Sequence, residues 1–274
     1  MDYKKLTFNE LQVLKKFLNI KNIEACDYTI GGIYMWIDYY NYEYYYDSDC
    51  FIIKTNVGFL YPLGNAEKGI KLIKEETDSI NVVPENELNS ISYKEKEELT
   101  DYKDYIYDAF DLAYLENHKY IKKRDQIKHF LSLYPNYSIE LIDSNNIKDI
   151  IEVFDNLVHI TDEISKEEVK STLMVLNNYD KFNFIGLLVK ESNKVIAFTI
   201  GEILFDTLQV HIEKANKEYK GIYQFINMEF SKYALENYNI KYINRQDDSG
   251  NPGLRQAKSS YYPIKYIKKY KVHF

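Results

Sequence analysis

The sequence predicts an α/β (α+β) protein whose mixed sheets are flanked by helices and whose two halves share a similar order of elements. Segments of alternating apolar residues, typical of strands, are interleaved with segments of helical period. The second half has the order β-α-α-β-β-β-α-β-α-β, and the first half is a rougher copy of it. The composition, with 45% hydrophobic and 28% charged residues, is that of a folded globular chain. We therefore expect two domains, over residues 1–135 and 136–274.

The expected first domain opens with a helix. Thr7 and Glu10 have the spacing of a capping box, and apolar residues at helical spacing follow them. The elements expected next are a hairpin over 43–54, a strand at 58–61, a helix after Gly64 and a strand at 80–83. Residues 85–117 are charged and carry no pattern that assigns them to an element. A helix over 119–133, which stops before Pro135, completes this domain.

The expected second domain is built around three consecutive strands and a long helix. Its predicted elements are a strand at 137–142, helices at 147–159 and 165–176, strands at 182–190, 194–203 and 207–214, a helix at 220–238, and strands at 241–245 and 264–272. Ser165 and Glu168 have capping-box spacing, and Ser192 and Asn193 form the first turn. Adjoining antiparallel strands followed by a helix that crosses to a further strand predict a mixed sheet with helices on its faces.

The overall composition argues against several classes of protein. A net charge of −7 is unlike that of a dedicated nucleic-acid binder, which usually carries a basic domain. Cys26 and Cys50 are too few for a disulfide framework, and we interpret them as buried free thiols. No apolar stretch approaches the ~18 residues of a membrane-spanning helix. Residues 1–5 lead into a polar helix and not into a signal peptide, so we expect a cytoplasmic protein.

Residues 242–263 concentrate three residue types that the chain otherwise rarely uses. They hold Arg245 and Arg255 out of three arginines, two of ten glycines and two of five prolines. Arginine grips carboxylates and phosphates through two bonds, and a strand end followed by a helix start commonly binds an anionic group. Two interpretations stay open: these arginines contact an anionic substrate, or Asp248 and Arg255 form an internal ion pair that fixes the loop.

A second candidate site lies at the end of the strand predicted for 207–214. Strand alternation places His211 and Glu213 on one face, where an imidazole and a carboxylate can together take a proton from an amine or hydroxyl nucleophile. The alternative is a buried, mutually satisfied pair without a chemical role. The other histidines lack metal-ligand spacing, so we expect no metal site.

Two basic clusters, with a net charge of +4 over residues 119–128 and +6 from Lys241 to the end of the chain, suit a polyanion such as RNA or a phospholipid headgroup. Ordinary solvated lysines are the alternative.

Several short blocks of the sequence together form a recognisable signature. They are Tyr242–Arg245, Asp248, Gly250, Pro252–Arg255, Ala257–Lys258, Ser260–Tyr261 and Pro263, with further blocks at 210–215 and 220–230. On these residues the chain resembles a bacterial family of unassigned function that is grouped with the phosphatidylglycerol lysyltransferase C-terminal domain. The resemblance implies two tandem GNAT-like (acyl-CoA N-acyltransferase fold) domains and kinship with lysylphosphatidylglycerol synthases and Fem-type aminoacyltransferases. Those relatives transfer an aminoacyl group from a charged tRNA to a lipid or peptide acceptor.

We therefore expect an acyl or aminoacyl transferase. Its donor substrate would be an aminoacyl-tRNA or an acyl-CoA, with no tightly bound cofactor, and its acceptor a small amine, a peptide or a lipid headgroup. Glu213, assisted by His211, is the candidate base, and Tyr261 is the candidate acid for the leaving group. The candidate substrate-binding residues are Asn244, Arg245, Asp248, Arg255 and Lys258.

The alternative is a catalytically inactive GNAT-fold module that binds or senses a ligand. It is favoured by the degraded acyl-CoA fingerprint, which would fall on residues 218–223. Only Gly221 survives there, and Tyr223 would obstruct the approach of a pyrophosphate to the backbone. A plain RNA-binding protein is a third hypothesis. The oligomeric state has no signal in the sequence.

Overall fold

Two compact units organise the fold of this computed structural model, which describes residues 1–18 and 23–274. Unit 1 comprises Met1–Tyr105, Gln246–Arg255 and Tyr266–Phe274, and unit 2 comprises Ile106–Arg245 and Gln256–Lys265. Both units are therefore discontinuous in sequence. None of the helices among the described residues has the length and apolar character needed to cross a bilayer.

Unit 1 contains a five-stranded sheet that includes the predicted hairpin. Its strands are β1 (Lys4–Lys5), β2 (Glu43–Tyr46), β3 (Cys50–Thr55), β4 (Gly58–Phe59) and β5 (Leu63–Gly64), in the order β1-β2-β3-β4 with β5 paired to β3. The hairpin is confirmed, with Tyr46 opposite Phe51. The helices of this unit are α1 (Leu11–Leu18), α2 (Ile30–Trp36) and α3 (Ala66–Lys74). The capping box of Thr7 and Glu10 is also confirmed, and it opens a 3-10 turn that leads into α1.

A second, three-stranded sheet in unit 1 joins distant parts of the chain. Strand β15 (Lys269–His273) lies between β6 (Ser79–Pro84) and β7 (Glu95–Glu98) and is antiparallel to both. The last strand of the chain is thus the centre of this sheet. The exposed, charged side chains of β7 explain why its sequence carries no apolar alternation.

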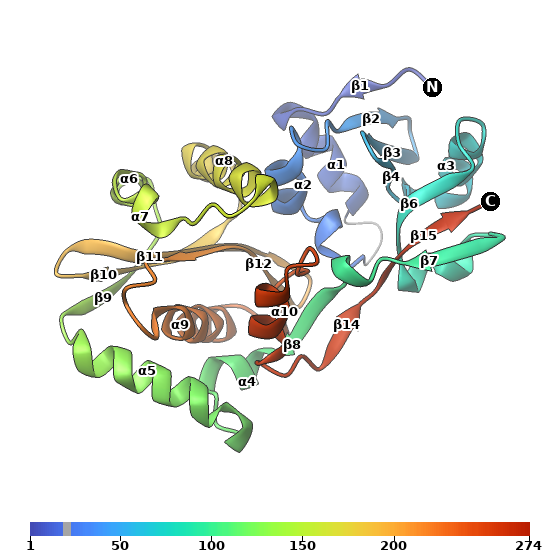
Figure 1. The fold of residues 1–274 in the computed structure, drawn as a ribbon. Coiled ribbons are helices and arrows are strands. Elements are labelled where there is room, and N and C mark those ends of the chain that lie inside the picture. Colours follow the sequence, from blue (N-terminus) through green and yellow to red (C-terminus); the bar gives the residue numbers. More distant parts are fainter. Residues whose placement is uncertain (19–22) are drawn as a thin grey trace. The chain divides into compact units, whose positions relative to one another are not determined.

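Most of unit 2 is built on a seven-stranded sheet (Figure 1). In spatial order its strands are β14 (Lys265–Ile267), β8 (Asp104–Asp108), β13 (Tyr242–Asn244), β12 (Thr207–Ala215), β11 (Lys194–Leu204), β10 (Ile185–Glu191) and β9 (Tyr137–Leu141). The three consecutive strands predicted from the sequence are confirmed as β10, β11 and β12, all antiparallel. Strands β12 and β13 are parallel, and helix α9 (Ile222–Asn237) connects them.

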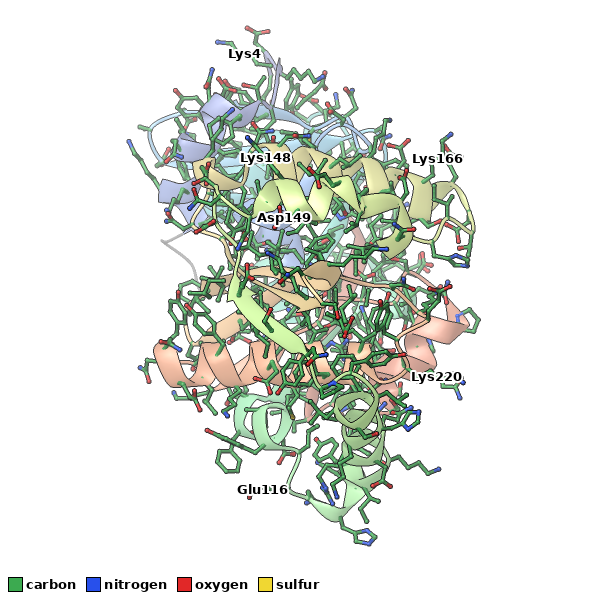
Figure 2. The ribbon with its side chains drawn as sticks, turned by 90° about the vertical axis from the view of Figure 1, so that its left-hand side faces the viewer. Lys4, Glu116, Lys148, Asp149, Lys166 and Lys220 are labelled. Atoms are coloured by element: carbon green, nitrogen blue, oxygen red, sulfur yellow. The ribbon has the colours of Figure 1, made fainter. Side chains whose placement is uncertain are left out.

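Helices cover both faces of this sheet within unit 2. Figure 1 shows α6 (Ile147–Glu152), α7 (Phe154–Leu157) and α8 (Glu163–Asn177) on one side, and α9, α4 (Ala109–Tyr114) and α5 (Ile121–Leu133) on the other. Helix α6 carries Lys148 and Asp149, which Figure 2 labels. Asp149 is 2.9 Å from the Nζ of Lys190 on β10, an ion pair that fastens α6 to the sheet. The short helix α10 (Pro252–Ser259) follows the loop after β13.

Two predicted helices differ from the observed ones. The helix expected over 147–159 is interrupted at Val153, which separates α6 from α7. The helix expected to begin at Ser165 begins instead at Glu163, because Asp162 is its N-cap. The Asp162 carboxylate accepts from the Ser165 backbone N–H at 2.8 Å, and the Ser165 hydroxyl accepts from the Asp162 N–H at 3.0 Å. Ser165 therefore serves as the third residue of a capping box and not as its first.

The division into compact units does not follow the expected boundary after residue 135. Residues 106–135 belong to unit 2, because β8 pairs with β13 and because α4 and α5 pack against α9. The C-terminal residues 266–274 belong to unit 1, because β15 pairs with β6 and β7.

Candidate functional site

The candidate site in unit 2 lies where β12 and β13 separate. The two strands pair only between 207–209 and 242–244, whereas β12 continues to Ala215 and the chain leaves β13 after Asn244. Beyond the last pair, no strand among the described residues pairs with the outer edge of β12. Glu213 on β12 and Arg245 just after β13 therefore face a place where backbone pairing has ended.

Glu213 and Arg245 form an ion pair at this place. Arg245 Nη2 lies 2.9 Å from Glu213 Oε1, and the two side chains are 13% and 12% exposed. On the other carboxylate oxygen, Asn227 of α9 donates from Nδ2 to Glu213 Oε2 at 3.3 Å. Burial works against the Arg245 charge, but Glu213, with Tyr107 and Tyr261, raises the pKa of Arg245 above its ordinary value. The Arg245 guanidinium therefore stays charged, because the nearby Glu213 carboxylate compensates for the loss of water around it.

Two buried polar atoms of this cluster have no hydrogen-bond partner in the part of the chain that the structure describes. Arg245 Nη1, a donor, and Asn227 Oδ1, an acceptor, are out of contact with solvent and form no hydrogen bond with the described residues. Leaving such an atom unsatisfied costs about 1–3 kcal/mol, so it calls for an explanation. A ligand or ordered water that both accepts and donates hydrogen bonds would satisfy the two atoms.

A tyrosine ring joins this cluster to a lysine of α5. Arg245 Cζ lies 5.0 Å and Lys123 Nζ lies 4.1 Å from the centre of the Tyr261 ring. Tyr261 is only 4% exposed, and burial raises the pKa of its hydroxyl, so it stays protonated. Lys123 Nζ also donates to Ser260 Oγ at 2.7 Å. Sequence reasoning placed Lys123 in a basic cluster and missed this contact, because the pairing joins residues 137 positions apart.

His211 has a different partner from Glu213. Ile200 pairs with Ile212 and Gly201 with Val210, so a bulge in β12 leaves His211 without an opposite residue. The simple alternation that predicted a shared face for His211 and Glu213 is therefore interrupted. The His211 Nε2 lies 2.9 Å from Glu202 Oε1, and the imidazole is 0% exposed.

Asp248 and Arg255 form the internal ion pair that the sequence left open. They lie in unit 1, where Arg255 binds Asp248 through Nε at 2.9 Å and through Nη2 at 2.7 Å. Asp248 is fully buried and also accepts from the Tyr105 hydroxyl at 2.5 Å. Arg255 extends the network to Asp101 at 2.6 Å. Burial works against ionisation of Asp248, but bonds from Arg255 and Tyr105 lower its pKa below the ordinary value. This pair fixes the loop that carries Gly250.

The other two predicted substrate-binding residues lie in unit 2. Asn244 is fully buried on β13, opposite Gln209 on one side and Ile106 on the other. Lys258 lies in the last turn of α10 and is partly exposed, and its carbonyl accepts from the Tyr107 hydroxyl at 2.8 Å.

The loop that would carry an acyl-CoA fingerprint packs against α5 at Gly221. Gly221 has φ +93°, and a Cβ built on it would lie 2.2 Å from the backbone oxygen of Gln126 in α5. A hollow of about 460 Å³ lies beside it, lined by Asp125, Gln126, His129, Lys220 and Gly221, and Figure 2 labels Lys220. The Tyr223 hydroxyl contacts both the N–H and the carbonyl of Ala215 at 3.3 Å. The backbone N–H and carbonyl of Ala215, on the edge of β12 that no described strand pairs with here, therefore have the Tyr223 hydroxyl as their partner.

Unit 1 holds a buried charged cluster that the sequence did not predict. Ligand atoms of Cys26, Asp104 and Asp247 lie within 4.8 Å of one another, as in a potential metal site. Lys269 Nζ, on a residue only 1% exposed, lies 2.7 Å from Asp104, 2.5 Å from Asp27 and 3.3 Å from Cys26 Sγ. The ammonium thus supplies positive charge where a metal ion would. The predicted free, buried state of Cys26 and Cys50 is confirmed.

Comparison with solved structures shows likeness over the whole chain. A conserved protein of unknown function from Bacteroides thetaiotaomicron is 26% identical, with a TM-score of 0.86 and coverage of 100% of this chain and 99% of that one. The structure of L-PGS from Bacillus licheniformis is 14% identical, with a TM-score of 0.65 and coverage of 96% and 91%. FemX is 10% identical, with a TM-score of 0.57 and coverage of 100% and 98%. No curated protein matches the chain.

These likenesses confirm the expected fold class, an α/β (α+β) chain of tandem GNAT-like fold. The mixed sheet flanked by helices is the seven-stranded one, in which β12 and β13 are parallel. The model of one protein family, described as phosphatidylglycerol lysyltransferase, C-terminal, matches residues 19–273. The match spans nearly all of the chain and includes every candidate site residue described above. The chain therefore belongs to the phosphatidylglycerol lysyltransferase C-terminal family.

Proposed function

We propose that the protein transfers an aminoacyl or related acyl group from an activated ester to an amine or hydroxyl acceptor. The observation that carries the proposal is the cluster of Glu213, Arg245 and Asn227 at the separation of β12 and β13. It combines a carboxylate with one unsatisfied buried donor and one unsatisfied buried acceptor. Such a set can bind a group that has both hydrogen-bond donors and acceptors, as an aminoacyl ester has.

The junction before α9 favours an aminoacyl-tRNA over an acyl-CoA as the donor. Acyl-CoA binding in this fold needs open backbone at that junction for the pyrophosphate. Here α5 lies against Gly221, and the Tyr223 hydroxyl takes the backbone groups of Ala215. The partly exposed basic helix α5 is a surface on which a polyanionic donor can be held.

Each residue of the cluster receives a role in this proposal. Glu213 holds the amine of donor or acceptor and takes its proton, while Arg245 keeps the carboxylate in place. Tyr261, whose hydroxyl stays protonated, donates a proton to the leaving group. The proton route runs through Glu213 and not through His211, whose imidazole is fully buried against Glu202. Arg255 and Asp248 order the loop after β13 and do not contact the reacting atoms.

A donor-consumption assay tests the proposal. We expect the protein to accelerate the loss of ester from a mixture of radiolabelled aminoacyl-tRNAs supplied with small amines, and to leave acetyl-CoA unchanged. Glu213→Gln keeps the size of the side chain and one acceptor oxygen for Arg245, replaces the oxygen that accepts from Asn227 with an NH2 donor, and removes the basicity, so the rate of transfer should fall by about 100-fold or more.

The matched control is Glu218→Gln, because Glu218 is an exposed glutamate in the loop after β12 and should leave the rate unchanged. Equal rates in Glu213→Gln and the parent protein would remove the base assignment. A rise in melting temperature with one donor and no consumption of any donor would contradict the transferase and support the ligand-binding module instead.

A further inference from the structure

Lys123 and Ser260 form a close lysine–serine pair in unit 2. Lys123 Nζ lies 2.7 Å from Ser260 Oγ, and both residues are partly exposed. Ser260 immediately follows α10, at the turn that leads to Tyr261. The proposed function uses neither side chain, although both border the Tyr261 ring that contacts Arg245.

Lys123 has the surroundings of a lysine that loses its proton readily. Among the described residues, no carboxylate pairs with its ammonium; Asp111 pairs instead with Lys119, in the 3-10 turn His118–Tyr120 just before α5. The charged and titratable groups that face Lys123 are Arg245 and Tyr261. Burial and the Arg245 charge lower the pKa of Lys123 to about 8. Burial beside a second cation is how proteins activate a lysine for chemistry.

The hydrogen bonds of Ser260 allow a proton to move toward Lys123. In the resting arrangement Lys123 donates to Ser260 Oγ, and Ser260 Oγ donates to the Ala257 carbonyl at 2.6 Å. When Lys123 is neutral, its lone pair becomes the acceptor. Rotation of the Ser260 hydroxyl then points its proton at Nζ without movement of either heavy atom.

We propose that Ser260 and Lys123 act as a serine–lysine dyad in which Ser260 carries the acyl group between donor and acceptor. This inference rests on the proposed function and gives it a covalent intermediate. Ser260 Oγ attacks the carbonyl carbon of the activated ester while its proton passes to neutral Lys123. The Oγ–C bond forms, the bond from carbon to the leaving oxygen breaks, and the leaving oxygen receives a proton from the Tyr261 hydroxyl, while Lys123 keeps the serine's proton.

The second half of the cycle returns the dyad to its starting state. The acceptor amine attacks the acyl-serine, its nitrogen bonds to the carbonyl carbon, and the C–Oγ bond breaks. Glu213 takes the proton from the amine, the Lys123 ammonium returns the serine's own proton to Ser260 Oγ, and the proton on Glu213 replaces the one that Tyr261 gave to the leaving group. No oxidant, metal or additional reactant is needed.

A fluorophosphonate probe tests the dyad without the natural donor. Serine attack on the probe forms a P–O bond and releases fluoride, and peptide mapping by mass spectrometry locates the adduct. We expect labelling at Ser260 at least 100-fold faster than at Ser259, the exposed serine beside it. The rate should rise with pH to a plateau, with a midpoint near the pKa of Lys123, about 8.

Matched variants show whether Lys123 acts as a base or only supplies a positive charge that holds the structure. Lys123→Arg keeps a cation over the Tyr261 ring but cannot lose its proton, so labelling should fall about 100-fold and lose its pH midpoint. Lys122→Met and Ser259→Ala, at the adjacent exposed residues, should label at the parent rate.

Labelling of Ser260 no faster than of Ser259, or full labelling in Lys123→Arg, would overturn the dyad. Transfer from aminoacyl-tRNA that persists in Ser260→Ala would also overturn it, while leaving the proposed function standing. Conversely, rapid labelling of Ser260 without any aminoacyl transfer would support the dyad and contradict the proposed donor.

Discussion

Lys269 illustrates how one residue determines the electrostatics of a buried cluster. Its ammonium faces the carboxylates of Asp104 and Asp27 inside unit 1, and Asp104 is fully buried. Burial, followed by Asp104, raises the pKa of Cys26 well above its ordinary value, so the thiol stays protonated and donates to Asp104 Oδ1 at 3.1 Å. Without Lys269, the Asp104 carboxylate would lose the cation that lies 2.7 Å from its Oδ1. A buried charge left in that state is strongly destabilising.

We therefore expect Lys269→Met to lower the free energy of unfolding by about 3–5 kcal/mol. Burial alone would lower the pKa of Lys269, but the charges of Asp104 and Asp27 raise it by more than burial lowers it. The pKa in the folded state therefore lies above the pKa in the unfolded state. The stabilisation is then fully present below the unfolded pKa and is lost only as the pH rises through the folded value. The difference between variant and parent should stay constant from about pH 6 to about pH 9 in urea denaturation. A difference that shrinks toward the upper end of this range would contradict this assignment of charge.

The adjacent Lys268 provides the control. Its ion pair with Glu98 spans 3.6 Å, and the two side chains are 40% and 32% exposed. Exposed pairs contribute about 1 kcal/mol or less, so Lys268→Met should be close to the parent protein. Similar losses in both variants would mean that the charge at position 269 is not the cause.

At the scale of elements, the sequence predicted the regular strands well and the interrupted ones poorly. The run of β10, β11 and β12 and the β2–β3 hairpin follow from alternation and turn residues, which act locally. The bulge at His211 does not, because it depends on how β11 pairs with β12. Strand β8 was missed for a related reason: its residues are buried by packing that a short charged segment does not reveal.

The candidate site shows the same limit. The Arg245 segment stood out because arginine, glycine and proline are rare elsewhere in the chain. In the structure Arg245 contacts Glu213, which the sequence had singled out for a different reason, its place beside His211 near the end of a strand. Asn227 and Lys123 have no such signal: Lys123 is one of several basic residues on α5, and Asn227 is an asparagine between apolar residues in α9. Only the fold brings them beside Glu213 and Ser260.

The junction between β12 and α9 gives a prediction at this scale. Gly221 has φ +93°, where a side chain is strained, and its added Cβ would meet the Gln126 carbonyl at 2.2 Å. Both effects act on Gly221→Ala, so we expect a loss of about 2 kcal/mol or more, together with displacement of α5 from α9. Gly253→Ala, in the exposed first turn of α10, should change stability by about 1 kcal/mol or less. Thermal denaturation followed by circular dichroism measures both, and a neutral Gly221→Ala would show that α5 does not pack tightly there.

At the scale of the whole molecule, the chain crosses three times between its compact units after residue 245. Residues 246–255 return to unit 1, 256–265 to unit 2, and 266–274 to unit 1 again. The order of elements does not reveal this path, so a domain boundary drawn from that order falls at residue 135. A sequence of elements shows where one pattern ends and a similar one begins. It does not show that β15 pairs with β6 and β7, or that β8 pairs with β13.

Two fragments distinguish a boundary at residue 135 from the division that the contacts show. Fragment 136–274 lacks β8, α4 and α5, which unit 2 uses to cover β13 and α9, and it carries β15 without β6 and β7. Each lost contact exposes apolar surface and unpaired backbone, so we expect this fragment to melt without a cooperative transition. Fragment 106–265 keeps the whole of unit 2, with residues 246–255 as a loop, and should unfold in one cooperative step. Far-ultraviolet and near-ultraviolet circular dichroism during heating reads both outcomes. Cooperative melting of 136–274 would mean that β8, α4 and α5 are dispensable to the sheet that holds Glu213, and that the earlier boundary describes how this chain folds.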